Sequence, residues 1–584
     1  MKKGLTKLLL AGTAGVGLRV YFYNLEEQNS REYFSPKIRQ REENLQSMKK
    51  NEYDILVIGG GATGASVALE ASLRGLSCAL IEEGDFAGQT SSKSTKLLHG
   101  GVRYLDKAVH GKAVRENLEL VSEALKERTV FMRNAPHLTS WMGLGVPTES
   151  FLELGYFYTG LWVYHMLAKL QLYFVGLGHC EIPRPSFTFE STKVIPKLRD
   201  FYSGCVIYYD GQMNDSRLCL EILLTASSEN YVKGMVPAHV ANHVSFVDHI
   251  KKQGFIVGAK ARDNLTGEEF EIKAKSVINC TGPFADKVRK LALESSVDRM
   301  VPGKGSHIVL PASYAPNGKG MLIPETEDGR VVFLIPWEGK TLVGTTDTKG
   351  SLSKSNTISD EEKQFLVKEL SKYYAKGPLD IQDDILASFS GERPLVKQKA
   401  QETSELSRKH VIEVFMNGLI SVLGGKWTIA RHMGEEAVDT AVSRFGLTPE
   451  YKSRSFDCLL IGGHQVNYQE LAAKYGVSEE LALRLYRHYG SRTEKVLQIG
   501  EFREVVRDHP FIISEVIYAV REEYARTPMD VIAGRLNICF IDNQLAKGAL
   551  IAVSELMGDE LNWSKEEKRQ KYEEAYKILY QYRK

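Results

Sequence analysis

A glycine-rich turn near residue 60 constrains the fold of this chain more than any other feature. The run Gly59-Gly60-Gly61-Ala62-Thr63-Gly64 follows a short apolar segment, residues 53–58, and opens a segment of helical spacing that ends near Leu73. A second apolar run, residues 77–81, ends at Glu82. Apolar runs without polar alternation are typical of strands buried in a parallel sheet. The order of strand, turn, helix, strand and acid therefore predicts a right-handed dinucleotide-binding unit.

The glycines and the acid of this unit have separate expected roles. Gly59 and Gly61 permit the tight turn and the close approach of a pyrophosphate, while Gly64 lets the helix pack on the first strand. The helix N-terminus adds partial positive charge. Glu82, about 20 residues after the turn, is expected to accept a hydrogen bond from an adenosine ribose. This fingerprint alone does not distinguish NAD from FAD.

Composition excludes several classes of protein. The chain has 584 residues, more than one hydrophobic core usually serves, and its 43% hydrophobic and 25% charged residues are ordinary for a globular protein. A net charge of +2 gives no overall attraction to nucleic acid, so no nucleic-acid partner is expected. The seven cysteines form no Cys-x-x-Cys pair, so we expect neither a disulfide framework nor a zinc site.

The chain is expected to divide into three parts. Residues 1–50 begin with an apolar stretch among cations and continue as a polar segment, which we interpret as a mitochondrial targeting sequence and a linker, with a secretory signal as the alternative. Residues 51–447 predict an α/β domain with an inserted antiparallel sheet, and residues 448–584 predict a C-terminal helical domain. Strands are predicted at residues 255–258, 276–279, 307–310, 331–335 and 341–344, and helices at 469–475, 479–489, 511–523 and 544–555.

A polar segment after the first unit carries further candidates. Residues 90–104 read Thr-Ser-Ser-Lys-Ser-Thr-Lys-Leu-Leu-His-Gly-Gly-Val-Arg-Tyr and are too polar for a core. They form either a surface loop or a segment that contacts the phosphates and the ring of a cofactor. A later predicted strand ends at Thr281-Gly282-Pro283, where Gly282 allows a second close approach of the backbone.

These motifs are followed by several others along the chain. G-G-G-A-T-G is followed by T-S-S-K-S-T-K-L-L-H-G-G-V-R-Y-L, N-C-T-G-P, K-G-S-H-I-V, I-P-W, G-T-T-D, S-G-E-R-P-L and G-G-K-W-T. In this order the chain resembles the FAD-dependent glycerol-3-phosphate dehydrogenase family over residues 52–440. A weaker match follows in the helical part, notably at Glu523-Tyr524-Ala525-Arg526-Thr527-Pro528.

The resemblance implies an activity, a cofactor and a location. The expected reaction is oxidation of sn-glycerol 3-phosphate to dihydroxyacetone phosphate, with hydride passing from C2 to N5 of a non-covalent FAD and electrons passing to a ubiquinone-type acceptor. The expected location is the mitochondrion, peripheral on the inner membrane. One rival hypothesis is a related flavoenzyme that returns electrons to oxygen or oxidises a small amine. The other is a flavin-binding scaffold without turnover. Calcium regulation is not expected, because the sequence contains no Asp-x-Asp-x-Asp-Gly loop.

The resemblance also implies the residues of the site, because a phosphate dianion and a reacting hydroxyl must be held against the flavin. Arginine and lysine suit the phosphate. The substrate-binding candidates are Arg103, Tyr104, Arg393 and Lys426, with Lys304 and His307 in second rank. The cofactor-binding candidates are Gly59, Gly61, Gly64, Glu82, Ser91, Ser92, Lys96, Leu98, Gly282, Gly425 and Thr428.

Oxidation also needs a base for the proton of the C2 hydroxyl. We nominate His99 as the catalytic base and Arg393 as the residue that stabilises developing alkoxide charge. In the alternative, His99 only orders its loop by hydrogen bonding, and His307 or a water molecule is the base.

Two positions depart from the pattern of the family. Ile429-Ala430 precede Arg431 where relatives usually have a threonine and a tyrosine, which puts a hydroxyl role there in doubt. Glu392 stands where relatives carry an aliphatic residue. A carboxylate that points inward would weaken phosphate binding, whereas one that points to solvent would matter little.

The most apolar and aromatic stretch is residues 151–178. Glu153, His165 and Lys169 interrupt it, so it falls short of the roughly 20 apolar residues that a spanning helix needs, and we expect no transmembrane helix there. Its tryptophan and tyrosines suit a monotopic surface that dips into lipid and admits a quinone. The alternative is a buried helix pair or a subunit contact, as in a homodimer.

Overall fold

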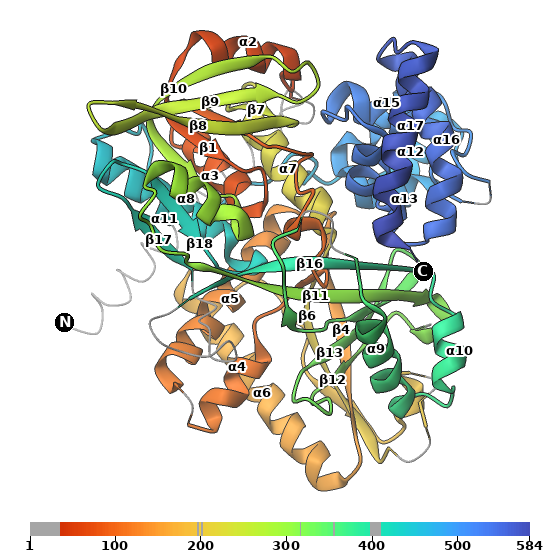
Figure 1. Cartoon of the computed structure of the whole chain (residues 1–584). Helices are drawn as coiled ribbons and strands as arrows, with labels where there is room; N and C mark the ends of the chain where they lie inside the picture. Colours follow the sequence, from red (N-terminus) through yellow and green to blue (C-terminus); the bar gives the residue numbers. More distant parts are fainter. Residues whose placement is uncertain are drawn as a thin grey trace, which may run out of the picture.

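The computed structural model describes residues 36–111, 113–195, 198–199, 202–315, 317–353, 357–397, 410–507 and 509–583. The predicted targeting segment, residues 1–25, lies outside the described residues. The described chain forms two large sheets and a group of C-terminal helices (Figure 1).

The first sheet carries the glycine-rich turn. Its path is β17 (Val411–Val414), β18 (Ile420–Leu423), β10 (Glu269–Asn279), β1 (Glu52–Ile58), β2 (Cys78–Ile81) and β7 (His239–Ala241), with β9 (Phe255–Asp263) and β8 (Val244–Lys252) paired beyond β10. The strands from β18 to β7 are parallel. Both faces of β1 are covered, so its apolar run needs no polar alternation.

Helices cover the two faces of this sheet. One face packs on α3 (Ala62–Leu73), α7 (Asp215–Ser227) and α11 (Ala430–Phe445), and the other packs on α2 (Arg41–Lys50) and α8 (Ala285–Ala292). The predicted strand–helix–strand unit is confirmed, and α3 has the predicted bounds.

The second sheet is largely antiparallel and confirms the predicted substrate sheet. Its path is β15 (Thr348–Lys349), β11 (Met300–Pro311), β14 (Lys340–Gly344), β13 (Val332–Trp337), β12 (Gly320–Ile323), β4 (Thr139–Thr148), β6 (Gly204–Met213) and β3 (Leu97–Leu98), with β16 (Ala387–Val396) paired to β11 and β5 (Ser186–Thr188) to β6. Around it lie α4 (Val102–Val109), α5 (Val114–Asn134), α6 (Phe151–Phe174), α9 (Asp360–Tyr373) and α10 (Pro378–Asp383). The long strands β11 and β16 run beneath the first sheet (Figure 1).

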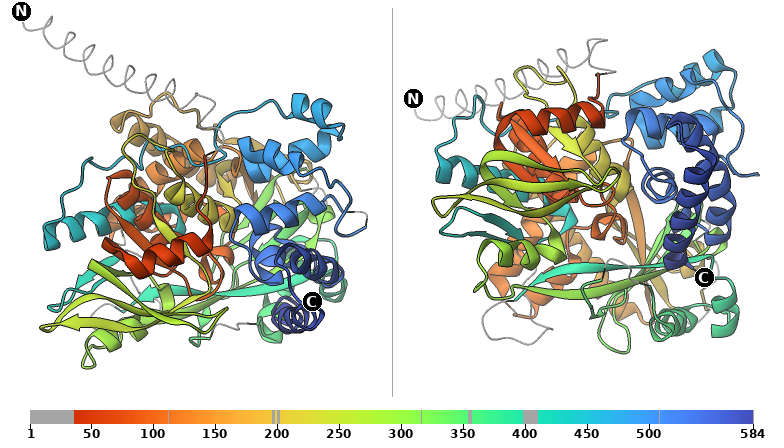
Figure 2. Two further views of the ribbon diagram at one scale, coloured as in Figure 1. Left: turned by 90° about the horizontal axis from the view of Figure 1, so that it is seen from above. Right: turned by 45° about the horizontal axis from the view of Figure 1, so that its top comes forward.

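The C-terminal residues form the predicted helical region. Its helices are α12 (Tyr468–Tyr475), α13 (Glu479–Tyr489), α14 (Thr493–Gln498), α15 (Ile513–Glu522), α16 (Asn543–Glu560) and α17 (Lys565–Leu579). Figure 2 shows them gathered on one side of the molecule, beside both sheets. Phe540 of this region packs edge-on against Phe389 of β16, with ring centroids 4.9 Å apart, so the helices are anchored to the substrate sheet.

The linker predicted before residue 51 is wrong for its last ten residues, which form α2. The helix lacks a clear apolar period because buried polar contacts help to hold it. Arg41 pairs with Asp263 at 2.7 Å, and Asn44 donates a hydrogen bond to the Val240 carbonyl at 2.9 Å. Leu45 and Met48 complete the contact with the sheet. Periodicity alone does not reveal a helix whose partners lie about 200 residues away in sequence.

We predict that Arg41→Met destabilises the protein by about 3–5 kcal/mol, because it leaves the buried carboxylate of Asp263 without its counter-ion. Lys50→Met removes an exposed cation from the same helix and is expected to stay within about 0.5 kcal/mol of the parent. Urea unfolding measures both. Equal midpoints for the two variants would contradict this role of the Arg41–Asp263 pair.

Candidate active site

One elongated cavity contains most of the predicted site residues. Its volume is about 2780 Å³, well above the ~300–1,000 Å³ of ordinary small-molecule pockets. It is lined by Glu82, by the glycine-rich turn and residues 90–95, by Arg393 and residues 424–428, and by part of α6 and the exposed Arg103. Its volume and the number of segments that line it allow it to hold a dinucleotide in one part and a small substrate in another.

The dinucleotide end has the geometry that the fingerprint predicts. At Gly59, where φ is +106°, an added Cβ would lie 2.7 Å from the Cys280 carbonyl oxygen, so only glycine fits. Gly64 is a correction as a cofactor-binding residue, because it does not line the cavity. An added Cβ there would lie 1.9 Å from the Gly59 carbonyl oxygen, so the close packing of α3 on the turn requires glycine. A pyrophosphate can therefore contact the backbone of the turn and the N-terminus of α3 without intervening side chains.

Glu82 closes this end of the cavity. Its carboxylate accepts hydrogen bonds from the Gly60 amide at 2.7 Å and the Gly84 amide at 2.9 Å. Burial raises its pKa. A carboxylate has about four acceptor sites, so two bonds from the backbone leave capacity for ribose hydroxyls. These features fit the adenosine of FAD.

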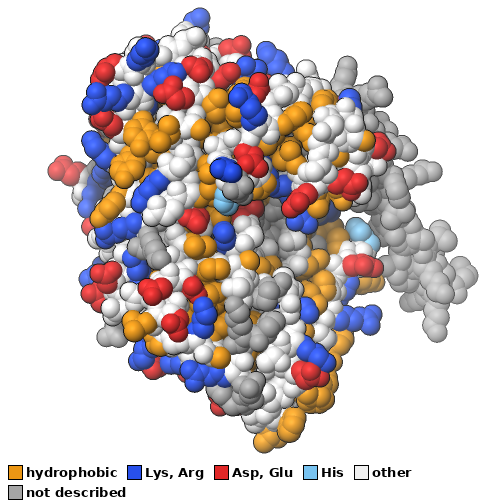
Figure 3. All heavy atoms as spheres, turned by 90° about the vertical axis from the view of Figure 1, so that its right-hand side faces the viewer, with side chains coloured by type: hydrophobic (Ala, Val, Ile, Leu, Met, Phe, Trp, Pro, Cys, Tyr) orange, Lys and Arg blue, Asp and Glu red, His pale blue; other side chains and the backbone are white. Residues whose placement is uncertain are grey.

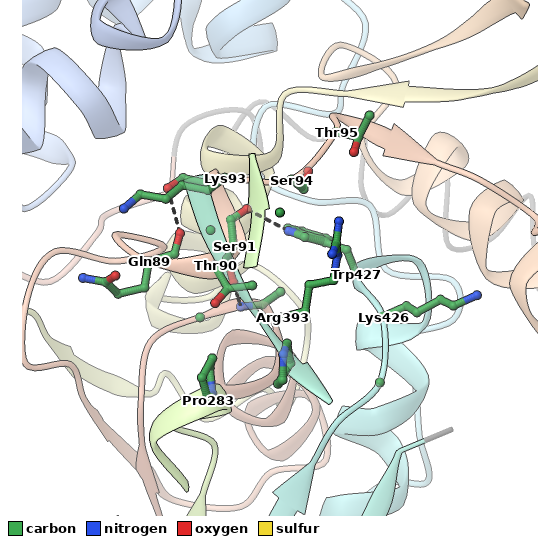
Figure 4. A pocket seen from close by; sticks show the side chains of 18 of the residues that line it. Gln89, Thr90, Ser91, Lys93, Ser94, Thr95, Pro283, Arg393, Lys426 and Trp427 are labelled. Carbon is green, nitrogen blue, oxygen red and sulfur yellow. Dashed lines mark hydrogen bonds between the residues drawn. The ribbon is translucent and has the colours of Figure 1, made fainter. Parts of the chain in front are cut away.

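The segment after the first unit binds the glycine-rich turn rather than forming a free loop. The Ser91 hydroxyl accepts a hydrogen bond from the Ala62 amide at 3.0 Å, and Trp427 Nε1 donates to the Ser91 carbonyl at 2.9 Å. Figure 4 shows Ser91, Pro283, Arg393 and Trp427, which are far apart in sequence, gathered around one space. Ser91, Ser92, Gly282, Gly425 and Thr428, which are predicted cofactor-binding residues, all line the cavity.

Lys96 and Leu98 are corrections, because neither lines the cavity. Around β3 successive side chains point to opposite sides, so Thr95, Leu97 and His99 face the cavity while Lys96 and Leu98 are buried behind it. Lys96 Nζ lies 2.6 Å from Asp215 and 4.6 Å from the centroid of the Phe540 ring. Its side chain holds the segment in place and does not reach a ligand.

Three predicted substrate residues meet at the far end of the cavity. Lys426 Nζ lies 3.9 Å from the centroid of the Tyr104 ring. Arg393 donates to the Asp347 carboxylate at 2.8 Å, the Thr345 hydroxyl at 3.0 Å and the Thr346 carbonyl at 2.9 Å. These contacts fix the guanidinium before a substrate arrives.

Arg103 lies at the mouth of the cavity rather than in its depth. Its side chain is exposed and donates to the Gly329 carbonyl at 3.0 Å. It can meet an anion that enters the cavity, but it is not fixed as firmly as Arg393.

The residues Thr345, Thr346 and Asp347 were missed by sequence reasoning. All three belong to the G-T-T-D motif, line the cavity and bind Arg393. The available signal was the position of this motif, in order, among the other motifs of the family.

Lys304 is a further correction. Its ammonium pairs with Glu362 of α9 at 2.7 Å and does not line the cavity. Lys304 faces Glu392 across the β11–β16 ladder, while Arg393 lies on the opposite face of the strand. Glu392 is 4% exposed and points neither to the cavity nor to solvent, so neither expectation for it is met.

The structure also places residues 429–431, where the sequence departs from the pattern of the family. Arg431 is turned away from the cavity and binds Glu127 through two hydrogen bonds of 2.7 and 2.9 Å. Ala430 lines the cavity and offers no hydroxyl, and Ile429 is buried. No side-chain hydroxyl reaches the cavity from these three positions.

Two of the histidines that line the cavity are candidates for the base, and their surroundings differ. His307 is buried, stacks on Phe389 at 4.9 Å between ring centroids, and shares a hydrogen bond of 3.0 Å with the Thr95 hydroxyl. Burial lowers the pKa of His307 well below the usual value, and the nearby charges of Arg393 and Lys96 lower it further. His307 is therefore a neutral imidazole. His99 is only partly buried, at the end of β3 beside Thr428.

Comparisons with known proteins agree with this geometry. The sequence family described as FAD dependent oxidoreductase matches residues 54–439, and the one described as the C-terminal domain of alpha-glycerophosphate oxidase matches residues 453–568. The mitochondrial glycerol-3-phosphate dehydrogenase of Mus musculus is 39% identical over 560 residues, which cover 92% of this chain and 75% of the mouse protein. That of Arabidopsis thaliana is 38% identical over 558 residues, 90% of this chain and 86% of the plant protein.

A solved structure is similar over nearly the whole chain. The glycerol-3-phosphate dehydrogenase from Bacillus halodurans, complexed with FAD, superposes with a TM-score of 0.71 at 27% identity and covers 93% of this chain and 97% of its own. The cavity described above fits that cofactor. The chain therefore belongs to the FAD-dependent glycerol-3-phosphate dehydrogenase family of the mitochondrial type.

Proposed function

We propose that this protein oxidises sn-glycerol 3-phosphate to dihydroxyacetone phosphate at the end of the cavity that holds Arg393 and Lys426. The observation that carries the proposal is a pair of cations fixed on glycine-rich segments beyond a dinucleotide site. A phosphate dianion is attracted to such cations, whereas an amine substrate is repelled by them. A scaffold without turnover has no need of this arrangement.

Each residue of the site has a separate proposed role. Lys426, supported by the Tyr104 ring, and Arg103 at the mouth bind the phosphate, and Arg393 stabilises negative charge as it develops on the C2 oxygen. When bound, FAD accepts the hydride that C2 loses. Asp347, Thr345 and Thr346 keep the Arg393 guanidinium oriented, so little reorganisation is required during the reaction.

His99 is the base in this proposal. It lines the cavity beside residues 424–428, on the strand that also presents Thr95 and Leu97. His307 is the alternative: its Nε2 is engaged with Thr95, and its Nδ1 is buried with no hydrogen-bond partner among the described residues. The two candidates differ in how they respond to pH.

A pH profile distinguishes the two histidines. Because its pKa is lowered well below the usual value, His307 stays neutral between pH 6 and 8 and contributes no titration there. An acid limb inside this range therefore reports a base other than His307, because protonation of that base removes activity. If His99 is the base, we expect the parent and His307→Asn to show such a limb.

His99→Asn is expected to lower kcat/KM roughly 100-fold or more and to remove that acid limb. A parent profile that is flat between pH 6 and 8 would instead assign the base to His307 or to a water molecule.

Arg393 provides a test of charge stabilisation. Arg393→Lys keeps one charge but loses the three hydrogen bonds that orient it, and we expect kcat/KM for glycerol 3-phosphate to fall roughly 100- to 1,000-fold. Arg569→Lys, on the exposed face of α17, is the matched control and is expected to keep the activity of the parent. Rates are measured as anaerobic loss of flavin absorbance after mixing. Similar rates for both variants would remove Arg393 from the mechanism.

We also propose that the electrons leave to a ubiquinone-type acceptor at the inner mitochondrial membrane, on which the protein lies peripherally. Among the described residues no helix is long and apolar enough to span a bilayer. The support is the apolar surface of α6, which we define by six exposed side chains of that helix that do not line the cavity. They are Phe151, Leu152, Met166, Leu170, Tyr173 and Phe174.

Other residues of α6 line the cavity that contains the substrate residues. Val109, Tyr156, Phe157 and Val163 line the cavity near α4 and α6, so an apolar acceptor has a route toward the flavin end. Hydrophobic side chains are visible at the lower end of the molecule in Figure 3, where α6 lies in Figure 1. Exposed apolar patches of this kind mark membrane or protein contacts.

Vesicle binding tests the membrane surface. Leu152→Ser combined with Phe174→Ser is expected to weaken co-sedimentation with phosphatidylcholine vesicles at least about tenfold and to slow quinone reduction, with reduction of a water-soluble acceptor unchanged. Val297→Ser combined with Met416→Ser, which are equally exposed elsewhere, is the control.

Normal vesicle binding by the α6 variant, together with loss of a homodimer in sedimentation, would identify the α6 surface as a subunit contact instead. Oxygen consumption at the parent rate in the absence of quinone would favour an oxidase.

A further inference from the structure

The Glu523–Pro528 motif lies where the helical domain meets the first sheet. Glu523 is fully buried and binds Arg217 of α7 through two hydrogen bonds of 2.7 and 2.8 Å. It also accepts a hydrogen bond from Arg492 at 2.9 Å. Burial alone would raise the pKa of Glu523, but the two arginines lower it to about 2. The motif therefore fixes the following residues, 527–535, against the dinucleotide-binding unit.

A second group of charged side chains lies close to the Glu523–Pro528 motif. β2 and β7 are parallel neighbours, with Ile81 opposite Ala241, so the residues that follow them meet at one edge of the sheet. From that edge Asp85 accepts a hydrogen bond from Arg535 at 3.0 Å, and His243 Nε2 lies 2.9 Å from Asp530. Asn242 donates to Asp85 at 3.0 Å. Two ion pairs thus join the edge of the sheet to the helical domain.

This junction is a wall of the cavity. Glu82, Asp85 and His243 line it from the sheet, and residues 527–530, 533 and 534 line it from the helical domain. In folds of this type a nucleotide lies beyond the carboxyl ends of the parallel strands, with its adenosine ribose at the acid that ends the second strand. The helical domain therefore faces the position that the adenosine of FAD occupies.

We infer that the helical domain is part of the cofactor site: residues 527–535 close the adenosine end of the FAD cleft, and the pairs Asp85–Arg535 and His243–Asp530 hold it closed. These four side chains are positioning residues, since they act on the wall of the cleft. FAD can leave only when this wall opens, so docking of the helical domain and retention of FAD are coupled, and each strengthens the other.

A metal ion is a weaker explanation for the same residues. Asp85, His243 and Asp530 offer ligand atoms within 4.8 Å of one another. However, Arg535 already binds Asp85, and Asp530 accepts hydrogen bonds from the amides of Arg526 and Thr527 at 2.8 and 2.9 Å. A cation placed there would be repelled by the Arg535 guanidinium.

Hydrogen exchange of the unmodified protein tests the coupling. The amides of residues 527–535 are expected to exchange more slowly in the FAD-loaded protein than after removal of FAD, and to regain protection when FAD is added back. Protection confined to the glycine-rich turn and residues 82–99, with residues 527–535 unchanged, would overturn the inference.

Two glycines of the helical domain give a matched pair of variants. An added Cβ at Gly534 would lie 2.6 Å from Asp85 Oδ2, whereas at Gly548 the nearest atom is Val506 Cγ1 at 4.0 Å. Gly534→Ala is expected to release FAD about tenfold faster on dilution, and Gly548→Ala is expected to match the parent.

His243→Asn gives an independent check of the second pair. The φ of His243 is +54°, a conformation that asparagine tolerates, and the variant removes the contact of the imidazole with Asp530. It is also expected to release FAD faster. FAD release at the parent rate in both Gly534→Ala and His243→Asn would overturn the role of these contacts.

Discussion

The close contact of backbone with backbone at the glycine-rich turn is the constraint on which the site depends. An added Cβ at Gly64 would lie 1.9 Å from the Gly59 carbonyl oxygen, so α3 can start directly above the end of β1 only with glycine there. This position of α3 brings the Ala62 amide to the Ser91 hydroxyl. Through that bond the turn positions residues 90–99, and with them His99 and the cavity face of β3.

Buried charges connect the parts of the molecule that surround the cofactor. Lys96 pairs with Asp215 behind the cavity, and Glu523 joins α7 to the helical domain. A buried charge is costly unless it is paired, so each pair favours one arrangement of its two segments. The cleft is therefore shaped by contacts between segments far apart in sequence, and the helical domain belongs to it.

Much of the fold could be predicted from the spacing of apolar residues, but much of the site could not. The strand–helix–strand unit and α13 appear at the predicted residues because their signals are local. Helix α2 was missed because its partners are distant, and Lys96, Leu98 and Lys304 were misplaced because their side chains point away from the cavity. Residue order reveals which segments meet, but strand direction decides which side chains face the ligand.

The most direct test of the account is anaerobic mixing of the FAD-loaded protein with glycerol 3-phosphate, with glycerol as the control, while the flavin absorbance is followed. If Arg393 and Lys426 form a phosphate site beside the flavin, the phosphate ester bleaches the flavin and glycerol does not. A flavin that stays bound and fully oxidised with glycerol 3-phosphate would contradict the proposed activity. Equal bleaching by glycerol would contradict the role given to the two cations.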